Sequence, residues 1–312
     1  MSSEPVGNVN SSGSVVAAVD GSAGGGRALE WALAAARLRG APLRIAHVRA
    51  YDIPLVDGPF TAVIERPDAD PVLAHVRASL EGRADLPELE FVTVDGRPGR
   101  ELPRLGADAA LLVLGSRGRG GFAGLLLGSN GVACAREADC PVVVVPRPRQ
   151  DAGGGARRGT DEVEDECPEV VLGLSAPAPD EGALDFAFAE AARRRARIRV
   201  VAAYPWPVLS ATAAGDFVMK AVADAETEKG YGELAGGLLA PHRERHPDVP
   251  VDVSLASGDA AGHLVEASRS ADLVVVGRHR RRPAPGRMLG SVTNAVLLHS
   301  ACPVAVVPQR SA

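Results

Sequence analysis

Short apolar runs alternate with amphipathic segments along this chain. Residues 15–19 are predicted to form a buried strand, and apolar positions from Ala28 to Ala36 recur at helical spacing before Gly40 ends that helix. Asp70 and Pro71 supply a cap and a first-turn proline for a second helix. Further strands are expected at 43–48, 89–94, 110–114 and 141–145, and further helices at 99–105 and 129–138. Strands that alternate with helices predict a parallel α/β sheet.

Residues 148–168 interrupt this alternation. They contain three consecutive glycines at 153–155 and the acidic run DEVEDE at 161–166, a composition typical of a linker. Residues 1–13 are polar and lack the apolar stretch of a signal peptide, so we expect a disordered tail. The predicted domains therefore span residues 14–147 and 169–309.

The pattern begins again after the linker. Strands are expected at 170–174, 198–203 and 249–255, with helical residues at 216–245. Four pairs of residues then keep a constant separation of 162 positions: Gly96 and Gly258, Gly115 and Gly277, Gly128 and Gly290, and Cys140 and Cys302. Because these positions hold register while loop lengths vary, the chain is predicted to be a tandem repeat of one domain.

Composition limits the classes of function. The 312 residues exceed the usual size of one domain, and 46% hydrophobic with 23% charged residues is ordinary for a globular protein. A net charge of −5 gives no electrostatic case for a nucleic-acid partner, and no apolar run reaches membrane-spanning length. The four cysteines have no metal-binding spacing, so we expect reduced thiols and a cytoplasmic location. Cys140 and Cys302 are expected to be buried, and Cys167 exposed.

The stretch GSRGRGGFAGLLLGS, residues 115–129, lies between a predicted strand and a predicted helix. Glycine permits backbone conformations and close approaches that a β-carbon would block, and Ser129 is a suitable N-cap for the helix. A strand, a glycine loop and a helix N-terminus in series can present N–H groups to a phosphate. A purely structural tight turn fits the same spacing.

Asp20 is the second candidate feature, because it ends the first strand. In open parallel sheets, ligands bind beyond the carboxyl ends of the strands, where the strand order reverses. Asp20 would face the loop after Gly115 across that point, and its carboxylate could accept hydrogen bonds from ribose hydroxyls. Asp20 before Gly21 also fits a simple turn.

These residues resemble the universal stress protein family. The resemblance rests on Gly-x2-Gly-x9-Gly-Ser after the fourth strand, on a strand ending in Asp-Gly-Ser, and on the ending Cys-Pro-Val-Val-Val-Val, and both halves share it from first strand to last. It implies two doubly wound domains, each a five-stranded parallel sheet of order 3-2-1-4-5 with helices on both faces. It also implies association through the fifth strands, residues 142–145 and 304–307, within one chain, with or without a further homodimer.

The resemblance further implies an adenine-nucleotide ligand at the switch between the first and fourth strands: ATP, with or without Mg²⁺. Asp20 would contact the nucleoside, the backbone of Val48 the adenine edge, and the glycines and Ser129 the phosphates. Asn130-Gly131 departs from the usual Val-Ser/Thr and removes one hydroxyl contact. The expected ATP site consists of Asp20, Val48, Gly115, Arg117, Gly118, Gly128, Ser129 and Asn130. Arg117 and Arg119 could neutralise phosphate charge, but exposed loop arginines are more often simply solvated.

The second half is expected to hold a weaker site. Ser175 stands where Asp20 stands, and Arg280 replaces the second glycine of the motif. Loss of the carboxylate removes an acceptor worth about 1.5–3 kcal/mol. The residues that keep the pattern are Gly277, Gly290, Ser291, Val292 and Thr293. Basic side chains that could compensate by binding an anion are Arg278, Arg280, Arg281, Arg282 and Arg287.

Three functions remain open from the sequence. The first is a stress-response protein that binds ATP in its first half and acts through nucleotide-linked regulation or partner binding, with slow hydrolysis at most. The second is a nucleotide-free adaptor with degenerate sites, and the third an ATP-cleaving transferase, for which no catalytic residue can be identified. His242 and His246, four residues apart, are expected at a solvated helix end rather than around a metal.

Overall fold

The computed structural model describes residues 13–50, 69–118, 127–147, 167–204, 216–278 and 288–309, with the backbone alone for 216–225. The elements of the first half are β1 (Val15–Ala18), α1 (Ala23–Arg39), β2 (Leu43–Arg49), α2 (Pro71–Leu80), β3 (Leu89–Asp95), α3 (Pro98–Leu105), β4 (Leu111–Gly115), α4 (Ser129–Glu137) and β5 (Val142–Val145). Those of the second half are β6 (Glu169–Leu174), α5 (Glu181–Arg194), β7 (Arg197–Tyr204), α6 (Asp216–Arg245), β8 (Val251–Ser257), α7 (Ala260–Ala267), β9 (Leu273–Gly277), α8 (Ser291–His299) and β10 (Val304–Val307).

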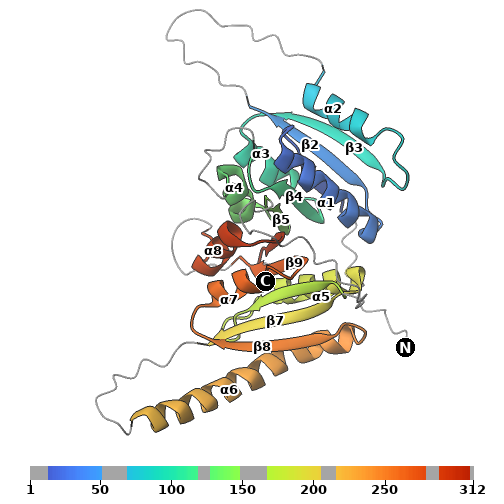
Figure 1. Ribbon diagram of the computed structural model, residues 1–312. Coiled ribbons are helices and arrows are strands. Elements are labelled where there is room, and N and C mark those ends of the chain that lie inside the picture. Colours follow the sequence, from blue (N-terminus) through green and yellow to red (C-terminus); the bar gives the residue numbers. More distant parts are fainter. Residues whose placement is uncertain are drawn as a thin grey trace, which may run out of the picture.

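Within the described residues, all the strands belong to one ten-stranded sheet, in the order β3-β2-β1-β4-β5-β10-β9-β6-β7-β8. Each half contributes five parallel strands in the predicted order 3-2-1-4-5, so the predicted α/β fold class is confirmed. The halves join at the centre of the molecule, where β5 and β10 run antiparallel with Val143 opposite Ala305 (Figure 1). The fifth-strand association expected within the chain is therefore present.

Helices cover both faces of the sheet. On one face, α1, α2, α5 and α6 enclose a core that includes the fully buried Leu33, Leu43 and Phe188. On the other face, α3, α4, α7 and α8 enclose a core that includes Leu112 and Val274. Because strands of a parallel sheet are buried on both faces, they are nearly continuous apolar runs, as in Val142–Val145.

The strand register aligns the two halves residue by residue. Val15 on β1 lies opposite Leu111, and Val170 on β6 lies opposite Leu273. Leu111 and Leu273 are separated by the same 162 residues as the repeated glycines. Counting along β1 and β6 from these pairs places Ser175 at the position of Asp20. The two halves can therefore be compared side chain by side chain.

Polar contacts add to the junction between the halves. We call Arg39, Glu190, Arg193 and Arg194 the junction cluster. The side chain of Glu190 is 0% exposed and accepts hydrogen bonds from Arg39 on α1 and from Arg193 and Arg194 on its own helix. Burial lowers the pKa of Arg39 to about 10, which leaves it cationic at neutral pH. The cluster thus fixes α5 against α1 through charges held away from water.

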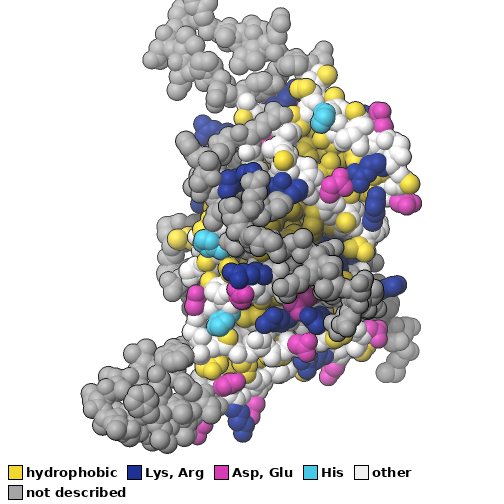
Figure 2. All heavy atoms as spheres, in the orientation of Figure 1, with side chains coloured by type: hydrophobic (Ala, Val, Ile, Leu, Met, Phe, Trp, Pro, Cys, Tyr) yellow, Lys and Arg dark blue, Asp and Glu magenta, His cyan; other side chains and the backbone are white. Residues whose placement is uncertain are grey.

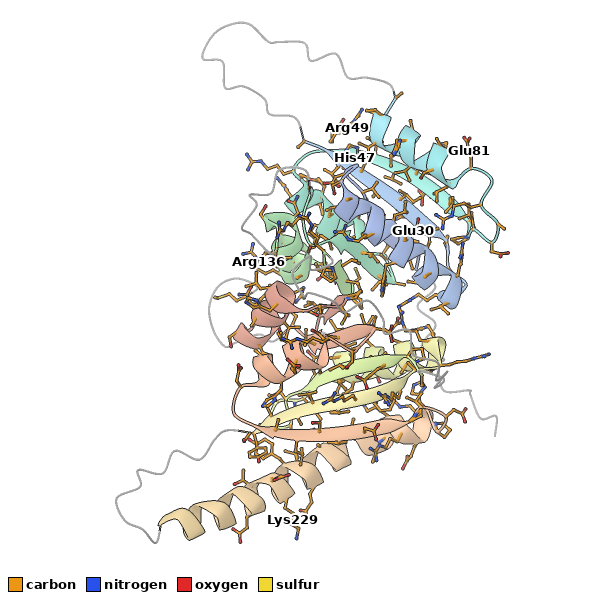
Figure 3. All side chains as sticks on the ribbon, in the orientation of Figure 1. Glu30, His47, Arg49, Glu81, Arg136 and Lys229 are labelled. Carbon is orange, nitrogen blue, oxygen red and sulfur yellow. The ribbon has the colours of Figure 1, made fainter. Side chains whose placement is uncertain are left out.

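Helix α6 spans the whole predicted helical region of the second half and extends past the sheet edge (Figure 1). Lys229 on α6 points away from the sheet (Figure 3). At the other end of α6, the expectation of a solvated histidine pair is wrong for His242. Its ring is buried and stacks on Phe188 with ring centroids 5.3 Å apart. His246 is only partly exposed and also lies near Phe188.

Arg195 ends α5 in the left-handed conformation, with φ of 51°. Gly40 takes the same place after α1, with φ of 59°, and both backbone N–H groups donate to carbonyls of the last turn. A β-carbon makes this conformation unfavourable, so Arg195→Gly is expected to raise the free energy of unfolding by about 0.5–1 kcal/mol. Urea denaturation measures this change. The matched variant Gly40→Ala should shift the midpoint in the opposite direction, and a lowered midpoint for Arg195→Gly would contradict the account.

Asp70 caps α2, as the sequence predicts, and also binds the neighbouring strands. Its carboxylate accepts from the backbone N–H groups of Val72 and Leu73, from His47 Nδ1 at 2.7 Å and from the Thr93 hydroxyl at 2.9 Å. His47 lies on β2, beside Arg49 (Figure 3). Burial would raise the pKa of Asp70, but the bonds from His47, Leu73 and Thr93 outweigh it and lower that pKa.

Asp70→Asn is expected to reduce the free energy of unfolding at pH 7 by about 1.5–3 kcal/mol, the usual value of hydrogen bonds to a charged group. A carboxyl whose folded pKa is lowered stabilises the fold above its unfolded pKa of about 3.9, and this contribution is lost as pH falls through the folded value. The difference between wild type and variant should therefore shrink toward pH 3. Urea denaturation at pH 7 and pH 3 checks this, and a difference independent of pH would contradict it.

Candidate functional site

A hollow of about 80 Å³ lies at the carboxyl ends of β1 and β4. These two strands are neighbours in the sheet although they are not consecutive in sequence, so the hollow lies where the strand order reverses. The predicted residues that line it are Asp20, Val48, Gly115, Arg117, Gly118 and Asn130. Segments far apart in the sequence therefore meet at the predicted place.

Asp20 follows β1 and is partly buried at the floor of the hollow. Its Oδ1 accepts from the backbone N–H of Ser22 at 3.0 Å and from the Ser22 hydroxyl at 2.6 Å. The Ser22 oxygen in turn accepts from the N–H of Gly25 and caps α1. The turn role that the sequence left open for Asp20 is thus present, and the carboxylate still borders the hollow.

Glycines bring the loop after β4 against the start of α1. A β-carbon at Gly115 would lie 2.6 Å from the backbone of Gly24, and one at Gly118 would lie 2.5 Å from Asp20 Oδ2. A β-carbon at Gly24 would lie 2.5 Å from the carbonyl oxygen of Arg117. Gly115 and Gly118 therefore have a steric reason to be glycine. Sequence reasoning missed Gly24 and Gly25, although the run of three glycines that follows Ala23 was a visible signal.

The start of α4 corrects one sequence expectation. Ser129 is not the N-cap: Gly128 is, and Ser129 is the first helical residue. The N–H of Gly128 donates to the carbonyl of Ser116 at 2.7 Å, and no side chain caps the helix. The first N–H groups of α4 therefore have no side-chain cap, and Asn130 of the first turn lines the hollow. Gly128 and Ser129 adjoin the hollow rather than line it.

Gly128 has no conformational reason to be glycine. Its φ is −80°, and among the described residues a β-carbon would approach nothing closer than 3.5 Å. Any residue could adopt that backbone. Within the described part of the chain, therefore, neither the backbone conformation nor a close contact requires glycine at this position.

Helix α3 supplies the wall that sequence reasoning missed. Pro98 and Leu102 line the hollow opposite Val48, and Leu102 is buried. They place apolar surface next to the end of β2. Only the strand order brings α3 over β2, so no local pattern in the sequence could have shown this wall.

The second half is built differently at the equivalent place. Asp180 caps α5, is buried, and accepts from the N–H of Ala183. A β-carbon at Gly277 would lie 2.4 Å from Asp180 Oδ2, whereas the equivalent Gly115 faces the backbone of Gly24. A carboxylate therefore occupies the space beside the first glycine of the second motif. As an ionised carboxylate, this group would oppose binding of a phosphate there.

Thr293 also has a structural role. It is buried, and its hydroxyl donates to the carbonyl of Gly277 at 2.9 Å. Gly290 caps α8, with Ser291 as the first helical residue and Val292 partly buried behind it. Gly290, Ser291, Val292 and Thr293 thus lie together at the start of α8. The Thr293 hydroxyl already donates its hydrogen bond to the backbone of Gly277.

The anion-binding role suggested for Arg278 is wrong. Its side chain is buried and donates to the carbonyls of Arg136 and Ala138, at the end of α4 in the other half. Arg136, labelled in Figure 3, lies beside the second half. Arg278 therefore joins the halves. The other basic candidates, Arg119, Arg280, Arg281, Arg282 and Arg287, lie outside the described residues.

The cysteines have the exposures expected from the sequence: Cys140 and Cys302 are buried, and Cys167 is exposed. Cys134 is buried too, and burial raises the pKa of all three buried thiols to about 12. We expect one thiol per folded chain to react rapidly with Ellman's reagent at pH 8, and four after unfolding in urea. Cys167→Ser should abolish the rapid phase, and a rapid phase that survives this change would contradict the structure.

The described part of the chain has no metal-ligand cluster and no membrane-spanning helix. No group of three or more His, Cys, Asp or Glu side chains there could hold a metal ion. No helix among those residues has both the length and the apolar character needed to cross a bilayer. On the face shown in Figure 2, acidic and basic side chains are interspersed rather than gathered in a field of one sign.

Solved structures share this architecture. A functionally unknown protein of Pseudomonas aeruginosa matches 97% of the chain with 95% of its own, at a TM-score of 0.64 and 15% identity. A universal stress protein of Archaeoglobus fulgidus matches 96% of the chain with 99% of its own, at a TM-score of 0.57 and 16% identity. At these identities the likeness shows the fold.

Sequence comparison shows the family. A universal stress protein of Mycobacterium tuberculosis is 32% identical over 304 residues, which cover 95% of this chain and 97% of that protein. One of Mycolicibacterium smegmatis is 31% identical over 307 residues, with 95% and 97% covered. Residues 12–146 and 169–308 each match the universal stress protein family. The chain therefore belongs to the universal stress protein family, with two such domains in tandem.

Proposed function

We propose that the first half binds an adenine nucleotide at the hollow between β1 and β4, and that the protein acts in the stress response through this nucleotide-linked state. The observation that carries the proposal is the convergence of Asp20, Val48, Gly115 and Gly118 on one hollow at the reversal of strand order. Such switch points are where open α/β sheets bind ligands.

The proposal gives each wall of the hollow a role. The apolar side chains of Pro98 and Leu102 beside Val48 suit a base, and the Asp20 carboxylate suits ribose hydroxyls. A hollow of about 80 Å³ cannot hold a whole nucleotide, because small-molecule sites measure about 300–1,000 Å³. The phosphates would therefore lie outside it, next to Gly128 and the uncapped start of α4, whose N–H groups and dipole favour an anion.

The proposal assigns ATP as the ligand and binding as the activity, with hydrolysis slow at most. Arg117 lines the hollow and can offset phosphate charge, and Mg²⁺ would be held by the phosphates rather than by a carboxylate pair. The second half would bind nucleotide weakly or not at all, since the Asp180 carboxylate lies against Gly277 and Ser175 replaces Asp20.

A calorimetric titration with ATP and Mg²⁺ tests the proposal. Asp20→Asn keeps an acceptor for Ser22 but removes the charge, and we expect affinity to fall at least tenfold, as loss of a charged hydrogen bond worth about 1.5–3 kcal/mol requires. Ser175→Ala, at the matching position of the second half, should leave affinity unchanged. Absence of binding by wild type at millimolar ATP would refute the proposal.

A nucleotide-free adaptor is the second candidate, and the small size of the hollow favours it. Thermal denaturation separates the two functions. A ligand that binds only the native state must raise the midpoint temperature of unfolding. An adaptor that does not bind nucleotide would therefore show the same midpoint temperature with and without 5 mM ATP. This concentration is on the order of a thousand times a micromolar dissociation constant, so even moderate binding would be visible.

A further inference from the structure

A second hollow, of about 340 Å³, lies in the second half where the end of α7 covers β7 and β8. Its volume falls within the range of about 300–1,000 Å³ typical of small-molecule sites. Polar groups in its wall come from both strands and from the helix end. We call the set Arg199, Ser254, His263, Arg269 and Ser270 the α7 groove.

Arg199 is the unusual member of the α7 groove. Its side chain is only partly exposed, yet it makes no hydrogen bond or ion pair with any part of the chain that the structure describes. The register places Arg44 of the first half at the same position, since Arg44 lies opposite Val16 and Arg199 opposite Val171. Arg44 is paired: its guanidinium bonds Glu90 at 2.8 Å and Asp108 at 3.4 Å.

The substitutions between the two halves remove the partners of this arginine. Asp108 is the third residue after α3, and Ser270 is the third residue after α7, so a hydroxyl replaces the carboxylate. Asp252 lies opposite Arg199, as Glu90 lies opposite Arg44, but it is one methylene shorter and forms no ion pair with Arg199. The carboxylates that neutralise Arg44 therefore have no counterpart that reaches Arg199.

Other changes point the same way. His263 occupies the fourth position of α7, where α3 has Glu101, and Ser254 lies at the register position of Val92. One change runs the other way: Glu266 in the wall replaces Arg104 of the first half, but it is paired with Arg269 at 2.9 Å. Two carboxylates of the first half, Glu101 and Asp108, are thus replaced by uncharged donors, and the one acid that is added is offset by the added Arg269.

We propose that the α7 groove binds a small organic anion through a carboxylate or phosphate group held by Arg199. A guanidinium can bond either group with two parallel N–H donors. The Ser254 hydroxyl supplies a neutral donor, and Val201 and Ala267 in the same wall offer apolar contact to the carbon part of the ligand.

This site is separate from the nucleotide hollow and does not depend on it. Arg199 lies four residues before Ala203, which corresponds to Val48, so about 13 Å of strand separates it from the equivalent of the adenine wall. The α7 groove is also confined to the second half, where the nucleotide site is expected to be weak.

The test follows the Nε–H signals of arginine by NMR in the full-length protein, with Arg199→Gln used to assign the Arg199 signal. Sodium phosphate and sodium acetate are titrated separately at constant ionic strength. We expect the Arg199 signal to shift and saturate with at least one of them, and the anion that binds more tightly tells phosphate from carboxylate recognition. The local signal also separates this site from phosphate bound near α4.

Three variants make the test specific. Ser270→Asp restores the carboxylate of the first half, and we expect it to raise the apparent dissociation constant at least tenfold, whereas Ser270→Asn should change it less than twofold. Arg44→Gln, the matching change in the first half, should also leave it unchanged. An Arg199 shift that grows linearly with both anions, as for a solvated surface arginine such as Arg100, would overturn the proposal, as would tight binding that survives Ser270→Asp.

Discussion

Glu190→Ala is expected to lower the free energy of unfolding by about 3–5 kcal/mol, the cost of removing one partner from a buried ion pair. The side chains of Glu190 and Arg39 are 0% and 7% exposed, so the variant leaves a guanidinium buried without its counter-charge. Arg193 and Arg194 also bond Glu190, and they are more exposed than Arg39 and can reach water. Urea denaturation followed by circular dichroism measures the change.

A double variant shows whether the loss is electrostatic. Because a buried ion pair is costly to desolvate, replacing both charges with apolar side chains of similar length is often neutral. Glu190→Met with Arg39→Met should therefore recover most of the stability lost in Glu190→Ala. If the double variant is as unstable as the sum of the single ones, the junction cluster does not act through its charges.

Gly115→Ala is expected to reduce ATP affinity at least tenfold and to lower the free energy of unfolding by about 1–3 kcal/mol, as overpacking does. The added β-carbon would lie 2.6 Å from backbone atoms of Gly24, which cannot rotate away as a side chain could. The loop after β4 must then move off the start of α1, and the hollow changes shape. Calorimetry and urea denaturation measure the two effects.

Gly26→Ala is the matched control for this prediction. Gly26 is on α1, two residues after Gly24, and a β-carbon there would meet none of the described residues within 4 Å. Alanine is also the better helix former by about 1 kcal/mol, so this variant should be slightly more stable than wild type and bind ATP normally. Normal ATP affinity in Gly115→Ala would contradict the proposed site.

The fold could be predicted from the sequence because its signals are local. The Asp70-Pro71 start of α2 and the Gly40 stop of α1 are each formed by adjacent residues. The constant separation between Gly115 and Gly277 extended the prediction from one half to the other, and the family resemblance supplied the strand order that both halves show.

The errors of the sequence reading concern contacts between distant segments. Arg278 reads as part of a basic loop, and only the antiparallel pairing of β5 with β10 places it against the end of α4. His242 reads as a surface residue of a polar helix end, yet Phe188 of another helix covers it. Neither the hydrophobic periodicity nor a sequence motif indicates which side chain will contact a distant helix or strand.

In the candidate site, too, the features set by adjacent residues could be predicted and the contacts between distant segments could not. Asp20 and the glycine loop could be predicted because they follow strands directly. Asp180 could not, because it reads as an ordinary helix cap, and its approach to Gly277 depends on how the loop between β6 and α5 folds back. This carboxylate is the main structural reason to expect that the two halves differ in nucleotide binding.

Native mass spectrometry of the full-length protein with ATP and Mg²⁺ tests the central claim most directly, because it counts bound nucleotides per chain. The account predicts one nucleotide per chain in wild type and in Ser175→Ala, and none in Asp20→Ala at the same ATP concentration. Two nucleotides per chain, or one that persists in Asp20→Ala, would contradict it.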